Sequence, residues 1–319
     1  MFADLVTGPL LRELRTVAGI GLRQMATRTA ITVSYLSEVE TGRKPVSPTV
    51  LNAYRTVLGD PTLGLAGVDV ARLAATVADP TGAGSSSLKD VAVILDRSRR
   101  LDDAAGPQLV VPMARGLDGV ARVLATENVG GPQGAALASE AARFRGWLEL
   151  ATGHPHTSDK AFGDSVILAE GAGDQSQLEH AMSFRAYGLR ENGKLSAAID
   201  LTEAALALRG THPSLRVYDS YQLAKFLAAQ GYAGDAIRQL RKADRAAEAS
   251  HRTDPPEFAY WYSMGFWGLQ RGRVLALAGE HRQARSEVVA GLDALPSADR
   301  AATWATKWRA VLDGGDVPA

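Results

Sequence analysis

The apolar residues of this chain recur at three- and four-residue spacings, which predicts α-helices throughout. The clearest pattern lies in residues 22–44, where it indicates two short helices about a tight corner. The buried positions of these two helices would be Leu22, Met25, Ala26, Leu36 and Val39. Ala30 makes the corner, the hydroxyl group of Thr32 can cap the second helix, and Gly42 ends it.

Two further helices complete the N-terminal region. The first is predicted over residues 9–18, with Pro9 at its opening position. Its inward residues would be Leu10, Leu14, Val17 and Ala18. Ser47 followed by Pro48 caps and opens another helix, which runs to Leu58. Four or five short helices in this region predict a compact domain.

This region resembles the helix-turn-helix of the phage-repressor family (Cro/CI-like, also called xenobiotic-response-element or XRE type). The matching residues are Leu22, Ala26, Ile31, Ser34, Tyr35, Leu36, Ser37, Val39, Glu40, Gly42 and Arg43. The resemblance covers about residues 8–60 and implies a DNA-binding domain, to which we assign residues 1–66. In this motif the second helix lies in the major groove of DNA.

The resemblance also implies which side chains contact DNA. Those expected at base edges are Thr32, Val33, Ser34, Ser37 and Glu38. Those expected at phosphates are Arg23, Gln24, Thr41, Arg43 and Lys44. Glu38 and Glu40 would weaken DNA binding, and Ala30 replaces the usual corner glycine at a cost of about 1 kcal/mol if its backbone is left-handed. The alternative is a helical hairpin that serves only for packing or dimerisation.

A change in composition indicates where the first domain ends. Residues 79–87 (DPTGAGSSS) are rich in glycine and serine, which is typical of a linker. We therefore assign residues 67–87 to a connecting helix and linker, and residues 88–319 to a second domain. Its first helices are expected over residues 88–101 and 107–126.

A repeat follows, aligned on Gly193, Gly231 and Gly279. Small residues recur at fixed distances from these glycines, at Ala186, Ala198, Ala205, Ala224, Ala236, Ala243, Gly272, Ala284 and Gly291. Small residues let two antiparallel helices approach closely, and glycine makes the turn between them. Gly153, with Gly146 before it, indicates an earlier and degenerate copy.

These segments resemble the tetratricopeptide (TPR) repeat, with periods of 38 residues (193 to 231) and 48 residues (231 to 279). The resemblance implies an all-α chain whose second domain is a right-handed α-solenoid. A last helix over residues 297–312 would cap the stack, burying Trp304 and Trp308.

The repeat register predicts a ligand groove, because the first helices of stacked pairs share one face. Its residues would be His180, Ser183, Tyr187, Arg190, Tyr218, Tyr221, Lys225, Phe266, Leu269 and Arg273. Aromatic rings with cations among them suit a short peptide. The alternative is that the rings form inter-repeat core and the cations a solvated rim. Residues 257–267 carry six aromatic side chains around a predicted helix. Some would lie in the core and some would line a groove or a dimer interface, and the core is favoured for any one of them.

Together, the two domains resemble the peptide-sensing regulators of the RRNPP family, which act in quorum sensing. This resemblance implies a homodimer that binds a double-stranded DNA operator, for example as a repressor. A signalling peptide or small molecule in the groove would change the spacing of its two DNA-binding heads. The alternative is a protein-interaction scaffold whose repeats dock another protein, with the helix-turn-helix used mainly for assembly.

Charge and composition narrow these possibilities. The 319-residue chain has a net charge of zero, whereas residues 1–59 carry seven Lys or Arg against four acidic residues, a local surplus that suits DNA. The chain has no cysteine, which excludes disulfides and thiolate metal sites. No apolar run approaches 18 residues, so we expect a cytoplasmic protein without membrane contact. No nucleophile with a plausible base is apparent, so we expect no enzymatic activity, cofactor or metal.

Overall fold

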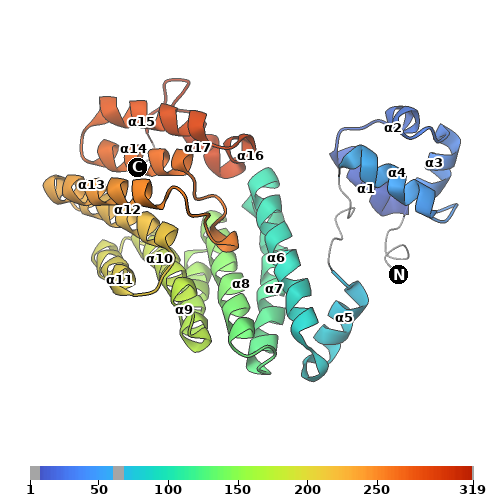
Figure 1. Cartoon of the computed structure of the whole chain (residues 1–319), viewed down its shortest axis with the longest axis horizontal. Coiled ribbons are helices and arrows are strands. Elements are labelled where there is room, and N and C mark those ends of the chain that lie inside the picture. Colours follow the sequence, from blue (N-terminus) through green and yellow to red (C-terminus); the bar gives the residue numbers. More distant parts are fainter. Residues whose placement is uncertain (1–7, 60–67, 318–319) are drawn as a thin grey trace. The chain divides into compact units, whose positions relative to one another are not determined.

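The computed structural model describes residues 8–59 and 68–317, and the chain separates into two compact units, Met1–Ala78 and Asp79–Ala319 (Figure 1). Within the described residues every regular element is a helix, so the predicted all-α fold class is confirmed. None of the described helices is both long enough and apolar enough to cross a membrane.

The first unit contains five short helices, of which the first four surround one core. These are α1 (Gly8–Val17), α2 (Leu22–Thr29), α3 (Val33–Glu40), α4 (Pro48–Leu58) and α5 (Val70–Ala78). The core residues are Leu11, Ile20, Met25, Ala26, Leu36, Val39, Val50, Leu51 and Tyr54. The predicted caps are confirmed, because the hydroxyl oxygens of Thr32 and Ser47 accept hydrogen bonds from the backbone N–H groups of Tyr35 and Val50, each at 3.3 Å.

The predicted inward face of the first helix is partly wrong. Ala18 lies beyond the end of α1 and is exposed, whereas Leu11 is fully buried. The side chains of Pro9, Leu10 and Val17 lie outside the described residues. Apolar residues at three- and four-residue spacings form two neighbouring stripes on this helix. The stripe that contains Leu11 is the buried one, because that side of the helix contacts α3 and α4.

Glu40 belongs to the core of the first unit. Its side chain is 3% exposed and accepts hydrogen bonds from Arg15 Nε at 2.6 Å and Arg15 Nη2 at 2.7 Å, and another from the hydroxyl group of Tyr54. Burial favours the neutral carboxyl, but the hydrogen bonds from Arg15 and Tyr54 outweigh burial and lower the pKa of Glu40. The expectation that Glu40 opposes DNA binding is therefore wrong, because its charge is buried and neutralised.

The second unit consists of paired helices followed by short C-terminal turns (Figure 1). The helices are α6 (Ser85–Ala105), α7 (Pro107–Thr126), α8 (Pro132–Ala151), α9 (Pro155–Ala172), α10 (Gln175–Glu191), α11 (Leu195–Ala207), α12 (Pro213–Ala229), α13 (Ala233–Ser250), α14 (Met264–Leu277), α15 (His281–Ala294), α16 (Ser297–Ala301) and α17 (Thr306–Arg309). Each even-numbered helix from α6 to α14 packs against the helix that follows it. The glycines predicted to make the turns, Gly153, Gly193, Gly231 and Gly279, have φ angles between 75° and 89°.

The predicted small residues lie where helix backbones approach closely. A Cβ atom on Gly272 would lie 2.5 Å from Val288 Cγ2, so α14 and α15 could not pack at their present distance with any larger residue there. In the degenerate copy, the Phe162 ring of α9 fills the space beside Gly146 of α8 and Gly188 of α10. The glycine-based repeat register therefore describes real helix pairs.

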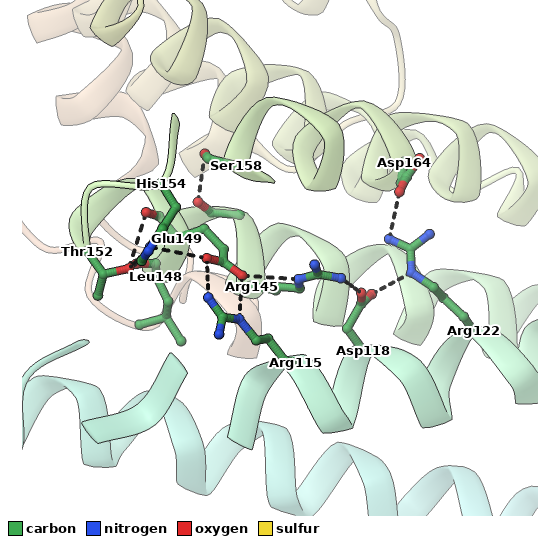
Figure 2. Close-up of polar contacts among 11 residues, drawn as sticks. Arg115, Asp118, Arg122, Arg145, Leu148, Glu149, Thr152, His154, Ser158 and Asp164 are labelled. Atoms are coloured by element: carbon green, nitrogen blue, oxygen red, sulfur yellow. Dashed lines mark hydrogen bonds and ion pairs between the residues drawn. The ribbon is translucent and has the colours of Figure 1, made fainter. Parts of the chain in front are cut away.

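Ion pairs with buried carboxylates join α7 to α8, and a further, half-buried ion pair joins α7 to α9 (Figure 2). The residues concerned are Arg115, Asp118 and Arg122 of α7, Arg145 and Glu149 of α8, and Asp164 of α9. Glu149 is fully buried and accepts two hydrogen bonds from Arg115, at 2.7 and 2.8 Å, which hold its pKa below the ordinary value. Asp118, 1% exposed, accepts hydrogen bonds from Arg122 and Arg145, both at 2.8 Å.

Two predicted boundaries are wrong. Ser85, Ser86 and Ser87, expected in a linker, form the first turn of α6, because Ser87 is buried against the helices and no glycine interrupts this turn. The helix expected over residues 297–312 is broken into α16, a 3-10 turn and α17. Trp308 and Val311 are nevertheless buried, so the segment covers the last helix pair without being one helix.

Replacing Ala30 with glycine should stabilise the first unit by about 1 kcal/mol. Ala30 has φ 55° and ψ 25°, the left-handed conformation in which a Cβ atom is strained and glycine is not. Hydrogen exchange of peptides from residues 8–59, which report this unit separately, should slow in the variant. Unchanged or faster exchange would contradict the prediction.

Replacing Glu40 with glutamine should destabilise the first unit by about 3 kcal/mol, because the Arg15 guanidinium would stay buried without its counter-charge. The matched control is Glu38→Gln, which removes a carboxylate from the same helix at a surface ion pair and should cost less than about 1 kcal/mol. The measurement is again hydrogen exchange of residues 8–59. Equal effects of the two substitutions would show that the Arg15–Glu40 pair does not hold this core.

Candidate functional site

The N-terminal end of α3 is the exposed part of the helix-turn-helix. Thr32, Val33 and Ser34 are exposed, and Ser37 and Glu38 are half-buried. The opposite side of α3 is fixed, because Leu36 and Val39 are fully buried in the core of the first unit. The helix thus presents short polar and apolar side chains on a rigid support.

The residues expected at phosphates are all exposed: Arg23, Gln24, Thr41, Arg43 and Lys44. Lys44 Nζ lies 2.6 Å from Glu38 Oε2 and 5.0 Å from the ring centroid of Tyr35. Glu38, expected at a base edge, therefore already forms an ion pair with Lys44. Among the described residues, the side chain of Arg43 has no hydrogen-bond or ion-pair partner.

A cavity of about 560 Å³ lies within the second unit. The first helix of each pair contributes to its wall, and so do residues 258–262 and 303–308. Its aromatic residues are Phe144, Trp147, Phe184, Tyr187, Tyr218, Phe258, Tyr260, Trp261, Tyr262, Phe266, Trp304 and Trp308. Its charged residues are Arg99, Asp102, Asp103, Glu140, Arg143, Lys225, Arg273 and Lys307.

Half of the predicted groove residues line this cavity, namely Tyr187, Tyr218, Lys225, Phe266 and Arg273. The other half, His180, Ser183, Arg190, Tyr221 and Leu269, do not.

Each of the other five has a different neighbour. Ser183 donates a hydrogen bond to Asp219, and Arg190 is ion-paired with Glu191. Tyr221 donates a hydrogen bond to Asp244 of α13 at 2.8 Å. Leu269 is fully buried in the core between the last helix pairs. His180, fully buried, has its ring covered by residues of a different segment.

That segment, residues 251–263 between α13 and α14, follows a path that the sequence did not predict. The sequence predicted a helix over 257–267, but only Phe266 and Trp267 of its six aromatic residues lie in α14. Phe258 stacks on His180, with ring centroids 4.9 Å apart, and Figure 1 shows the segment running back toward α8. The segment thus occupies part of the face on which the groove was predicted.

Tyr260 ties segment 251–263 to the first helix of the unit. Its hydroxyl group donates a hydrogen bond to Asp103, and the Arg100 guanidinium lies 3.5 Å from the centroid of its ring. The sequence separates these partners by about 160 residues, and no local pattern connects them. Trp147 and Phe144 were also missed as lining residues, because they lie in the degenerate copy whose register was not used.

The charges in the cavity wall are unequally compensated. Glu140 is paired with Arg99, and Asp102 accepts a hydrogen bond from Trp147 Nε1 at 3.2 Å. Burial raises the pKa of Asp102 to about 6, and the nearby Asp103 adds to the effect. Arg143 is buried and donates a hydrogen bond to Gln177 at 3.1 Å, and burial lowers its pKa to about 10. The wall is therefore aromatic with an excess of cations.

Comparison with known proteins supports the assignment of the first unit. Residues 8–61 match the family model described as a helix-turn-helix domain, which confirms that prediction.

In fold, the chain is similar to PlcR of Bacillus thuringiensis, solved in complex with the peptide PapR7 and DNA, at 16% identity and a TM-score of 0.45, covering 90% of this chain and 94% of that one. It is also similar to the TPR-like repeats of a kinesin light chain from Podospora anserina, at 16% identity and a TM-score of 0.43, covering 62% of this chain and 90% of that one. A sequence search of curated proteins gives no match.

Replacing Asp102 with asparagine should stabilise the protein at pH 7.5 and have less effect at pH 4.5. Because the folded-state pKa is raised to about 6, the ionised carboxylate costs stability, and this cost appears as pH rises through 4 to 6. Asparagine keeps an acceptor for Trp147. Urea denaturation followed by tryptophan fluorescence measures the difference, with Asp200→Asn on the exposed side of α11 as control. An equal effect at the two pH values would contradict the assigned pKa.

Proposed function

We propose that this protein is a sequence-specific, DNA-binding transcription regulator that acts as a cytoplasmic homodimer. Its second unit binds a signalling peptide or small molecule and controls the placement of the two DNA-binding units. The protein acts by binding and not by catalysis, and it needs no metal or cofactor. Whether target genes are repressed or activated depends on where the operator lies.

The observation that carries this proposal is the exposed N-terminal end of α3 on a helix-turn-helix core. Val33 can contact a thymine methyl group, and the hydroxyl groups of Ser34 and Ser37 can bond to base edges. Arg23, in the first turn of α2, and Arg43, after the C-terminal end of α3, are both exposed, as phosphate contacts require. Lys44 and Glu38 neutralise one another in part, which leaves Arg43 as the cation best placed to hold a phosphate.

A homodimer follows from the size and charge of one DNA-binding unit. The local charge surplus of this region is small for a DNA-binding protein, and two copies double the electrostatic attraction. Two recognition helices must lie about 34 Å apart to enter successive major grooves. A ligand that binds one arrangement of the dimer more tightly than another therefore controls operator affinity, and a few kcal/mol of differential affinity is sufficient.

The two classes of DNA contact predict different consequences for substitution. Arg43→Ala should weaken binding to all DNA sequences about equally and reduce the slope of log affinity against log salt by about 1. Ser34→Ala should change which sequences are preferred, by about 1–3 kcal/mol at the bases it contacts. The measurement is a gel shift over a range of salt concentrations, using DNA upstream of the protein's own gene and a randomised competitor.

Arg28→Ala is the matched control, because it removes one exposed arginine from the far end of α2. It should leave the salt slope nearly unchanged. If Arg43→Ala and Ser34→Ala lower affinity equally across sequences, α3 is not the reading helix. If the unsubstituted protein shows no salt-dependent binding, the protein is a scaffold and not a regulator.

A further inference from the structure

Cationic side chains gather in one part of the wall of the aromatic cavity, and one of them, Lys225, is buried. Elsewhere in the wall, the carboxylates of Asp102, Asp103 and Glu140 are engaged by Trp147, Tyr260 and Arg99, as described above. These groups satisfy one another and need no ligand. The four remaining charged positions are all cationic. Arg143 of α8 donates a hydrogen bond to Gln177, and Lys225, Arg273 and Lys307 come from α12, α14 and α17.

Lys225 is the most unusual of these residues. Its side chain is 2% exposed, and its Nζ atom lies 5.3 Å from the ring centroid of Tyr187 and 5.0 Å from that of Phe226. Within the described ranges 8–59 and 68–317, no carboxylate lies within 4.0 Å of Lys225 or of Lys307. A buried ammonium group without a counter-charge destabilises a folded protein, so its retention calls for a partner.

The neighbouring charges make this part of the wall strongly positive. Glu191 of α10 is paired with Arg190, and its charge offsets only part of the positive charge around Lys225 and Lys307. Burial lowers the pKa of Lys225 well below its ordinary value, and Arg273, Arg190 and Lys307 lower it further. Lys307 is exposed, and desolvation beside the cavity, followed by the charge of Arg273, lowers its pKa to about 8 although Glu191 acts in the opposite direction. An anion placed among these groups would relieve the repulsion and raise both pKa values.

The space beside these cations is walled by aromatic rings. Tyr218 and Phe266 are nearly parallel, with centroids 6.3 Å apart, and Trp304 stands edge-on to Phe266 at 6.0 Å. Rings in these orientations bind a flat apolar body by stacking. The volume of about 560 Å³ is typical of small-molecule pockets, and segment 251–263 already covers the adjoining face. The space therefore suits a compact molecule.

We propose that the second unit binds a small aromatic carboxylate, with the carboxylate between Lys225 and Lys307 and the rings against Tyr218, Phe266 and Trp304. This inference rests on the proposed function, since it names the signal that the regulator would sense. Arg273 stands beside the carboxylate and adds to the positive potential. Lys225 is retained at the expense of stability because it recognises the ligand.

The test uses 1-pyrenebutyrate and its neutral analogue 1-pyrenebutanamide, which differ in one charge. Energy transfer from tryptophan to pyrene reports binding, because Trp147, Trp304 and Trp308 line the cavity. The full-length protein should bind one pyrenebutyrate per chain, at least tenfold more tightly than the amide. Affinity for pyrenebutyrate should fall as pH rises from 7 to 9.5, because the lysines lose their protons. Equal affinity for the two probes, or no binding of either, would overturn the proposal.

Lys225→Met and Lys307→Met should each lower affinity for pyrenebutyrate about tenfold and leave affinity for the amide unchanged. Lys225→Met should also raise the melting temperature, because it removes a buried charge. Lys242→Met, on the exposed side of α13, should change none of these quantities. If both cavity variants retain the preference for the acid, the cations do not form the site.

The gel shift described above separates this inference from the proposed function. Salt-dependent DNA binding without binding of pyrenebutyrate would overturn the carboxylate proposal alone. Lysine-dependent binding of pyrenebutyrate by a protein that does not bind DNA would overturn the regulator proposal alone.

Discussion

The arrangement of the second unit depends on how closely the backbones of neighbouring helices can approach. A Cβ atom on Gly268 of α14 would lie 2.9 Å from the Cα atom of Gly291 of α15, and one on Gly265 would meet backbone atoms of residues 294 and 295. Glycine in a helix costs roughly 0.5–1 kcal/mol relative to alanine, so several in α14 are tolerated only because close packing compensates. That packing directs the first helix of each pair toward the cavity, and the aromatic site follows from it.

The two units use charge in opposite ways. In the first unit the buried guanidinium of Arg15 and carboxylate of Glu40 are matched within the core, and the exposed arginines remain available to a partner. In the second unit, cations face an enclosed aromatic space while the acids there are taken up by Tyr260, Trp147 and Arg99. Matched buried charges fix a structure, whereas an unmatched buried cation such as Lys225 lowers stability and is typical of a binding position.

Local interactions made much of this fold predictable. Thr32, Ser47 and the turn glycines act on backbone groups within a few residues, so their roles can be seen in the sequence. The same holds for the exposed face of α3. The cavity was only half predictable, because segment 251–263 has the aromatic content of a buried helix. Its path depends on Tyr260 meeting Asp103 and Arg100, far away in the sequence, and no periodic pattern encodes that contact.

The return of the chain to α6 changes the mechanical character of the repeat array. Tyr260 contacts Asp103, and Thr303 Oγ1 donates a hydrogen bond to the Asp102 carbonyl oxygen at 3.0 Å. In an open array each repeat contacts only its neighbours, so the ends can fray or extend independently. Here hydrogen bonds connect the C-terminal part of the array to its first helix, α6. Because these contacts couple the last helix pairs to the first, we expect the array to unfold more cooperatively than a linear stack of the same helices.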